Sequence, residues 1–175
     1  MSLNLNAAKG QRPAILIPDH TITPVLMRIK KGGHDDAEKG WTGGYATRNP
    51  KTGVVYLNCE GFIAEGDYAQ KRIRFKIGLD SPNSPDYQTM GLNFMRSIVD
   101  SAHGLMPEDA SAEAVKIRDE CDFPDLDGLE FTARIDVELG VPPYRDKNII
   151  NVAITPDDER YLNKSGKTKL SQTTK

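Results

Sequence analysis

The chain contains few of the residues that build metal centres, disulfide frameworks or membrane spans. Among its 175 residues are two cysteines, three histidines and one tryptophan. Cys59 and Cys121 lie far apart and neither belongs to a C-x-x-C pair, so we expect two reduced thiols and no metal. No apolar run approaches the length of a membrane span, and the run at 14–17 is too short for a signal peptide. The expectation is a cytoplasmic protein without a cofactor.

Signatures of catalysis are also scarce. Neither the Walker phosphate loop nor a G-x-G-x-x-G turn occurs, and no serine or cysteine stands in a recognisable nucleophile motif. One acidic set could chelate magnesium for a nuclease, and it consists of Asp125, Glu130, Asp136 and Glu138. Asp136 and Glu138 lie on the polar face of an alternating strand, which favours a structural role. We therefore expect no enzyme, and a metal-dependent nuclease stays an alternative.

Charge is distributed unevenly along the chain, although the formal net charge is only −2. Residues 28–76 carry ten lysines and arginines against six acidic residues, whereas residues 97–140 carry three against twelve. This separation is compatible with one basic surface for an acidic ligand and an acidic surface elsewhere. The acidic 97–140 region could instead bind a protein, so an adaptor or inhibitor is another alternative.

The most informative segment is a cationic strand at 71–79. Apolar residues there alternate with Arg72, Arg74 and Lys76, and successive strand residues point to opposite faces of a sheet. Three cations on one face repel one another unless an anion lies across them, and a polyanion with phosphates along its length meets this condition. The alternative is a solvated face whose cations are balanced by acidic neighbours.

Turn signals divide the first half of the chain into strands. The polar, glycine-rich residues 32–40 predict a mobile loop, and the proline and glycine of residues 49–53 predict a hairpin turn. The strands expected in this half lie at 22–31, 41–48, 54–64 and 71–79. Four strands joined in sequence by short turns predict an antiparallel meander.

Helices begin the second half. Apolar residues recur with a helical period at 90–103, where Gly104 can form a left-handed cap, and a second helix is expected at 110–121. Strands resume at 131–139 and 148–154. A helix that follows the third strand of a small barrel has the OB-fold order. We predict a mainly β, OB-fold-like small antiparallel barrel with a central helical insert.

A single domain is expected, with polar segments at both ends. It spans residues 14–156, with helices near 90–121. Residues 1–13 have the composition of a flexible lead-in, and residues 157–175 that of a polar, basic and disordered tail.

Aromatic residues accompany the cations. Trp41 lies beside glycines, with Tyr45 and Arg48 following. Exposed rings next to cations suit single-stranded nucleic acid, because bases stack on the rings while Lys and Arg contact the phosphates. Tyr56 and Tyr68 are further stacking candidates. The alternative for Trp41 is a structural position that covers one end of the barrel.

The order of these segments resembles a family of phage and prophage proteins similar to single-stranded DNA-binding proteins. The segments that carry the resemblance are 59–63, 65–69, 72–75, the helix at 92–104 that ends in Ser-Ala-His-Gly, 127–131 and 148–150. The resemblance implies an OB-like fold and a role in phage or prophage DNA replication or recombination. The basic C-terminus departs from the acidic, glycine-rich tail of bacterial single-stranded DNA-binding proteins, so recruitment of repair proteins through such a tail is not implied.

Together these observations predict a protein that binds single-stranded DNA with little sequence preference. The residues predicted to follow the phosphates are Arg28, Lys30, Arg72, Arg74 and Lys76, with Arg48 and Lys51 clamping the strand from one side. Those predicted to stack on bases are Trp41, Tyr45, Tyr56 and Tyr68. The expected partners are single-stranded nucleic acid, other phage replication or recombination proteins and further copies of the chain, and no membrane.

Overall fold

The structure is a computed structural model, and it describes residues 3–8, 10 and 15–162. Residues 1–2, 9 and 11–13 of the predicted lead-in and residues 163–175 of the predicted tail lie outside the described residues. Residues 157–162, which the composition places in the disordered tail, instead contact the domain. The Tyr161 hydroxyl donates a hydrogen bond to the Ser101 carbonyl oxygen at 2.8 Å, and the Leu162 carbonyl oxygen accepts one from the Thr132 hydroxyl at 3.0 Å.

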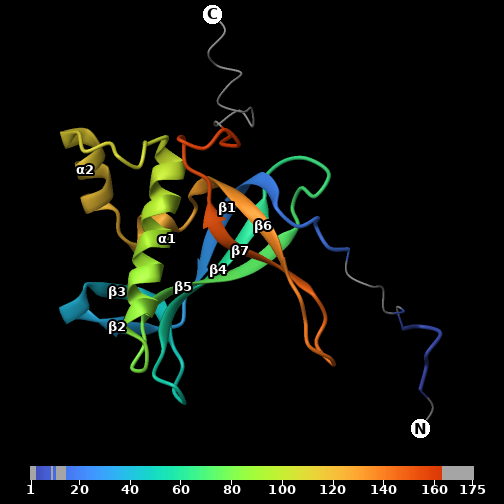
Figure 1. Ribbon diagram of the computed structural model, residues 1–175. Helices are drawn as coiled ribbons and strands as arrows, with labels where there is room; N and C mark the ends of the chain where they lie inside the picture. Colours follow the sequence, from blue (N-terminus) through green and yellow to red (C-terminus); the bar gives the residue numbers. More distant parts are fainter. Residues whose placement is uncertain (1–2, 9, 11–14, 163–175) are drawn as a thin grey trace, which may run out of the picture.

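The fold is mainly β, with helices between the fifth and sixth strands (Figure 1). The strands are β1 Thr21–Lys30, β2 His34–Asp36, β3 Trp41–Arg48, β4 Val55–Ile63, β5 Arg72–Asp80, β6 Glu130–Glu138 and β7 Lys147–Ala153. The helices are the 3-10 turn η1 Ala37–Lys39, then α1 Pro85–His103, α2 Ala112–Glu120 and α3 Phe123–Leu126.

The sheet curls into a half-barrel of OB-like form, which confirms the predicted fold class. Strand β1 pairs with β4 on one side and with β6 on the other, β4 also pairs with β5, and β6 pairs with β7, all antiparallel. Strands β5 and β7 lie in contact, so the two ends of this five-strand path approach each other. The inner face is buried and apolar and includes Val25, Met27, Leu57 and Ile135.

The predicted meander is wrong, because β1 does not pair with the next long strand. Residues 34–36 form β2, which pairs with β3, and β3 then meets β4 through only two residue pairs, Thr47 with Tyr56 and Arg48 with Val55. The remaining length of β4 is therefore available to β1. The predicted mobile loop at 32–40 is also wrong, since it contains β2 and η1 and is held by a hydrogen bond from the Gly44 backbone N–H to the Asp35 carboxylate at 2.7 Å.

Helix α1 covers the opening of the half-barrel and contacts β5, β6 and β7 (Figure 1). It begins at Pro85, five residues before the predicted start, because its polar first turn gives no apolar periodicity. Gly91 lets the helix approach β5, since a Cβ atom there would lie 1.7 Å from the Gly78 carbonyl oxygen. Gly104 ends the helix at φ 67°, as predicted. Within the described residues, no helix combines the length and apolar character needed to cross a bilayer.

Candidate nucleic-acid interface

The cations of β1 and β5 come together on the outer face of the half-barrel. In the β1–β4–β5 register, Lys30 is opposite Asn58 and Asn58 is opposite Lys76, which forms one row across the sheet. Arg28 is opposite Glu60 and Glu60 is opposite Arg74, which forms the next row. We call this surface, made of Arg28, Lys30, Glu60, Arg72, Arg74 and Lys76, the cationic face. All five of its basic residues are exposed, so the predicted alternation of β5 holds.

Glu60 is the one acidic residue of the cationic face, and its side chain is only 9 % exposed. Its carboxylate oxygens lie 3.3 Å from the Lys30 Nζ and 3.5 Å from an Arg72 guanidinium nitrogen. It therefore forms ion pairs with the diagonal neighbours on β1 and β5, although Arg74 is directly opposite on the ladder. The single negative charge of Glu60 therefore offsets one of the five positive charges and is shared between Lys30 and Arg72.

The other three cations are not balanced. Arg28, Arg74 and Lys76 form no ion pair with any acidic residue in the part of the chain that the structure describes. Arg74 and Lys76 are two residues apart on β5, and Arg28 and Arg74 lie on either side of Glu60, so the three positive charges share one face and repel one another. An external anion would relieve this repulsion. The question left open by the sequence, whether acidic neighbours balance this face, is answered in part. Glu60 offsets one positive charge, shared by Lys30 and Arg72, and Arg28, Arg74 and Lys76 have no acidic partner among the described residues.

A groove runs from the cationic face to the base of the β6–β7 hairpin. Its lining residues are Lys30, Tyr56, Asn58, Arg74, Phe75, Lys76, Glu138, Lys147, Ile149 and Asn151. Lys147 adds a cation that the sequence reasoning missed, and this residue is paired with Glu138 at 3.0 Å. The groove is polar and spans β1, β4, β5, β6 and β7, so it can hold an extended chain rather than a compact ligand.

Two aromatic residues line the groove, Tyr56 and Phe75, and Tyr56 is the more exposed of the two because Phe75 is buried. The Tyr56 ring is half-buried on β4, and the Lys76 Nζ lies 4.5 Å from the ring centroid. This distance allows a cation–π interaction, which holds the ring and the ammonium group side by side. A ring beside a cation is the arrangement in which a base stacks while its phosphate is neutralised.

The other predicted stacking residues lie elsewhere. Trp41 is only 8 % exposed, so the expectation of an exposed tryptophan is wrong. It lines an apolar cleft of about 330 Å³ together with residues of α1 and α3, and no residue lines both this cleft and the groove. Tyr45 is half-buried against Phe123, with ring centroids 6.3 Å apart, and Tyr68 is packed against the core. Burial in the core explains the aromatic and glycine pattern of 41–48 better than stacking does.

Arg48 and Lys51, the predicted clamp, are exposed at the β3–β4 hairpin. The hairpin turn is stabilised by the Asn49 side chain, which accepts a hydrogen bond from the Lys51 backbone N–H at 2.9 Å. Neither residue lines the groove. The hairpin projects beyond the sheet in Figure 1, as does the β6–β7 hairpin.

The four carboxylates considered for a nuclease do not converge. Asp125 caps α3, where it accepts a hydrogen bond from the Asp122 backbone N–H at 2.9 Å. Glu138 pairs with Lys147, and Glu130 stands at the opposite end of β6 from Glu138. Eight residues of extended strand separate these ends by roughly 26 Å. Asp125 and Glu138 therefore have structural partners, and Glu130 lies too far from Glu138 to share a metal ion with it.

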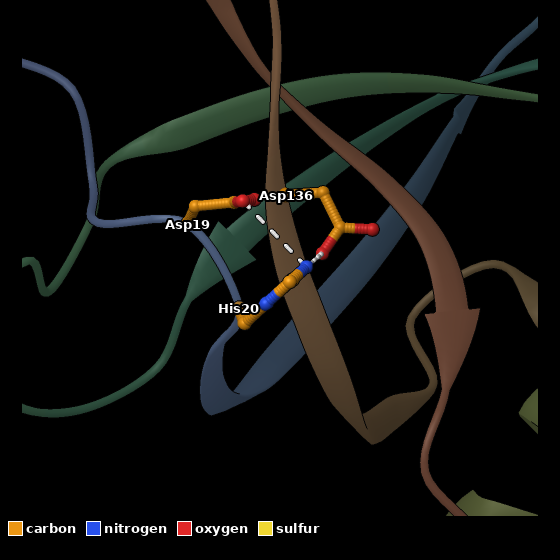
Figure 2. Close-up of side chains that lie close together, drawn as sticks. All are labelled: Asp19, His20 and Asp136. Carbon is orange, nitrogen blue, oxygen red and sulfur yellow. Dashed lines mark ion pairs between the residues drawn. The ribbon is translucent and has the colours of Figure 1, made fainter.

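Asp136, the fourth of these carboxylates, lies close to Asp19 and His20 (Figure 2). The His20 Nε2 is 3.6 Å from an Asp19 oxygen and 3.9 Å from an Asp136 oxygen. Arg134 also binds Asp136 through both guanidinium contacts, at 2.8 and 3.0 Å, so that carboxylate is already neutralised. Asp19 in turn accepts a hydrogen bond from the Val137 backbone N–H at 2.9 Å, which ties the N-terminal segment to β6.

The acidic 97–140 region also has structural roles. Asp100 is 1 % exposed and accepts hydrogen bonds from Arg96 at 3.0 Å and Arg118 at 2.8 Å. Arg96 and Arg118 also donate to backbone carbonyl oxygens of residues 106–109. Asp127 accepts a hydrogen bond from the Ile29 backbone N–H at 2.9 Å. Asp100 and Asp127 therefore have structural roles. Other acidic residues of the region, Glu113, Asp119 and Glu120 among them, are exposed, and a protein-binding role for them stays an alternative prediction.

Neither cysteine is activated. Burial, with a smaller contribution from the Asp127 charge, raises the pKa of the Cys59 thiol to about 12. Burial also raises the pKa of Cys121, reinforced by Asp125 and Asp122. Both groups are neutral thiols at pH 7.

No protein-family model matches the chain, and a search of curated proteins finds no relative. The resemblance to phage and prophage single-stranded DNA-binding proteins therefore stays a prediction.

Proposed function

We propose that this protein binds single-stranded DNA along the groove, with little sequence preference. The observation that carries the proposal is the placement of Arg74, Lys76 and Tyr56 on one face, with no acidic partner for either cation among the described residues. Arg74 and Lys76 contact phosphates, and Tyr56 stacks on a base. Arg28 extends the phosphate-binding surface to β1, and Lys30 and Arg72 flank it in their ion pairs with Glu60.

The expected lack of sequence preference follows from the kinds of contact. Phosphates are the same at every nucleotide, and every base offers a face on which a ring can stack. The resemblance to phage and prophage single-stranded DNA-binding proteins supports the proposal and suggests DNA replication or recombination as its setting.

Fluorescence anisotropy with labelled oligothymidine, titrated at several salt concentrations, tests the proposal. We expect binding that weakens with salt through counterion release, and an oligonucleotide that stays intact in the presence of magnesium. Absence of binding to single-stranded DNA and RNA at low salt would overturn the proposal. Tighter binding to RNA than to DNA would mean that the ligand of the groove is RNA. Magnesium-dependent cleavage would support the nuclease alternative.

A further inference from the structure

The β6–β7 hairpin carries three large apolar side chains that face solvent. Leu139, Val141 and Tyr144 are 78 %, 75 % and 78 % exposed. Apolar groups of this size are usually buried, and a cluster of them on an exposed turn marks a surface that contacts another molecule. All three lie within eight residues of the chain, between the last residue of β6 and the first of β7.

The hairpin is held in shape by its own backbone. The Gly140 backbone N–H donates a hydrogen bond to the Asp146 carboxylate at 2.8 Å, and the Tyr144 N–H donates one to the Val141 carbonyl oxygen at 2.9 Å. The two arms cross so closely at Gly140 that a Cβ atom there would lie 2.4 Å from the Tyr144 carbonyl oxygen. These contacts fix the backbone of the turn, so its exposed side chains project from a defined backbone conformation.

The hairpin also continues the groove. Glu138 and Lys147, which begin and end it, line the groove, and Arg145 is exposed between Tyr144 and Lys147. A strand that leaves Arg74 and Lys76 along the groove therefore arrives at a ring with cations beside it. Glu138 and Asp146 balance Arg145 and Lys147 on the hairpin, so it is the continuity with the groove that indicates which molecule the apolar side chains contact.

We infer that residues 139–146 form an apolar base-binding part of the interface, with Tyr144 stacked on a base and Leu139 and Val141 in contact with its neighbours. The inference rests on the proposed function and adds to it a second source of selectivity for single strands, beside Tyr56. Bases in a duplex are stacked on one another and offer no free face, whereas those of a single strand do. The groove cations bind phosphates of either form, and the hairpin discriminates between them.

A second copy of the chain is the competing occupant. A stable dimer buries about 800 Å² on each partner, and a single hairpin turn is too small to supply that area. A single-stranded nucleic acid that already lies along the groove needs no such area on the hairpin.

The test compares Tyr144→Ala and Tyr144→Phe in the full chain, with oligothymidine and a duplex of equal length as probes. Loss of a stacked base weakens binding by about 5-fold to 100-fold, so we expect this loss with Tyr144→Ala for the single strand only. Tyr144→Phe keeps the ring and should bind as the natural chain does. The dependence on salt should be unchanged in both variants, because no phosphate contact is removed.

The outcomes separate the inference from the proposed function. If the natural chain binds no single-stranded nucleic acid, both fail. If the natural chain binds and Tyr144→Ala binds equally well, the proposed DNA binding along the groove is kept and the hairpin inference is overturned. The hairpin inference also fails if Tyr144→Ala abolishes self-association in sedimentation velocity while affinity for the oligonucleotide is unchanged. An equal loss for single strand and duplex would likewise overturn it, since the hairpin would then not discriminate.

Discussion

Two buried carboxylates, each between two cations, have different surroundings and therefore different consequences. Asp100 is bound by Arg96 and Arg118, whose remaining donors bind backbone carbonyl oxygens. Glu60 is bound by Lys30 and Arg72, whose side chains are 55 % and 49 % exposed. The Asp100 network keeps one excess positive charge, which backbone carbonyl oxygens surround, whereas the Glu60 pairs lie beside three further cations that no described acidic residue neutralises.

The comparison teaches that charge counted along the chain does not locate a binding surface. The 97–140 region is the most strongly charged by count, yet Asp100, Asp125 and Asp127 each accept hydrogen bonds within the fold. The 28–76 region has a smaller imbalance, but the sheet concentrates its cations on one face. Charges without internal partners, rather than total charge, distinguish the groove from the Asp100 network.

The largest expected change is a loss of folding stability in the Asp100→Ala variant. Arg118, with a side chain only 11 % exposed, would lose its partner, and removing one member of a buried ion pair destabilises a protein by about 3–5 kcal/mol. Urea denaturation followed by circular dichroism measures the change. Glu113→Ala, on the exposed surface of α2, is the matched control and should change stability by less than about 0.5 kcal/mol. A stability loss as small as that of the control would show that Asp100 is not structural.

The next effect is expected from Arg74→Ala combined with Lys76→Ala. Each phosphate contact contributes about 0.7 to the salt slope for single strands, so the slope should fall by about 1.4, with weaker binding at low salt. Anisotropy titrations at four or more salt concentrations give the slope. Lys116→Ala, on α2 and outside the groove, should leave it unchanged. An unchanged slope in the double variant would move the interface away from the groove.

A smaller change in the opposite direction, a steeper salt slope and tighter DNA binding, is expected from Glu60→Gln. The amide has no charge to hold Lys30 and Arg72, so both become available to phosphates. The salt slope should steepen by about 0.7 for each of the two that gains a phosphate, and affinity at low salt should rise. The same titrations measure it, with Glu65→Gln in the β4–β5 turn as the control. Weaker binding by a folded Glu60→Gln variant would mean that Glu60 positions Lys30 and Arg72 for the ligand.

The smallest expected change is in the fluorescence of Trp41 when DNA binds. Trp41 lies in the apolar cleft and not in the groove, so saturating oligothymidine should leave its emission intensity and wavelength unchanged. The chain has no other tryptophan, which makes the signal unambiguous. Strong quenching would place DNA near the cleft and reverse the assignment of the two regions.

Several features of the fold could be predicted from the sequence because they depend on local periodicity. The alternation of Arg72, Arg74 and Lys76 with apolar residues determines that these cations share one face of a strand. Gly104 ends α1 where the apolar period stops, because only a residue tolerant of positive φ suits that cap. The position of helices between the strands at 71–79 and 131–139 indicates the OB-like order of strands and helices.

The partners of each strand and side chain were decided only in the tertiary structure. Whether β1 pairs with β3 or β4, whether Trp41 is buried, and whether Glu60 neutralises Arg74 or Lys30 depend on contacts between residues far apart in the chain. The hairpin of β6 and β7 reaches the groove only because the sheet curls. Periodicity determines which way a side chain points on its own strand, and long-range packing determines what lies opposite it.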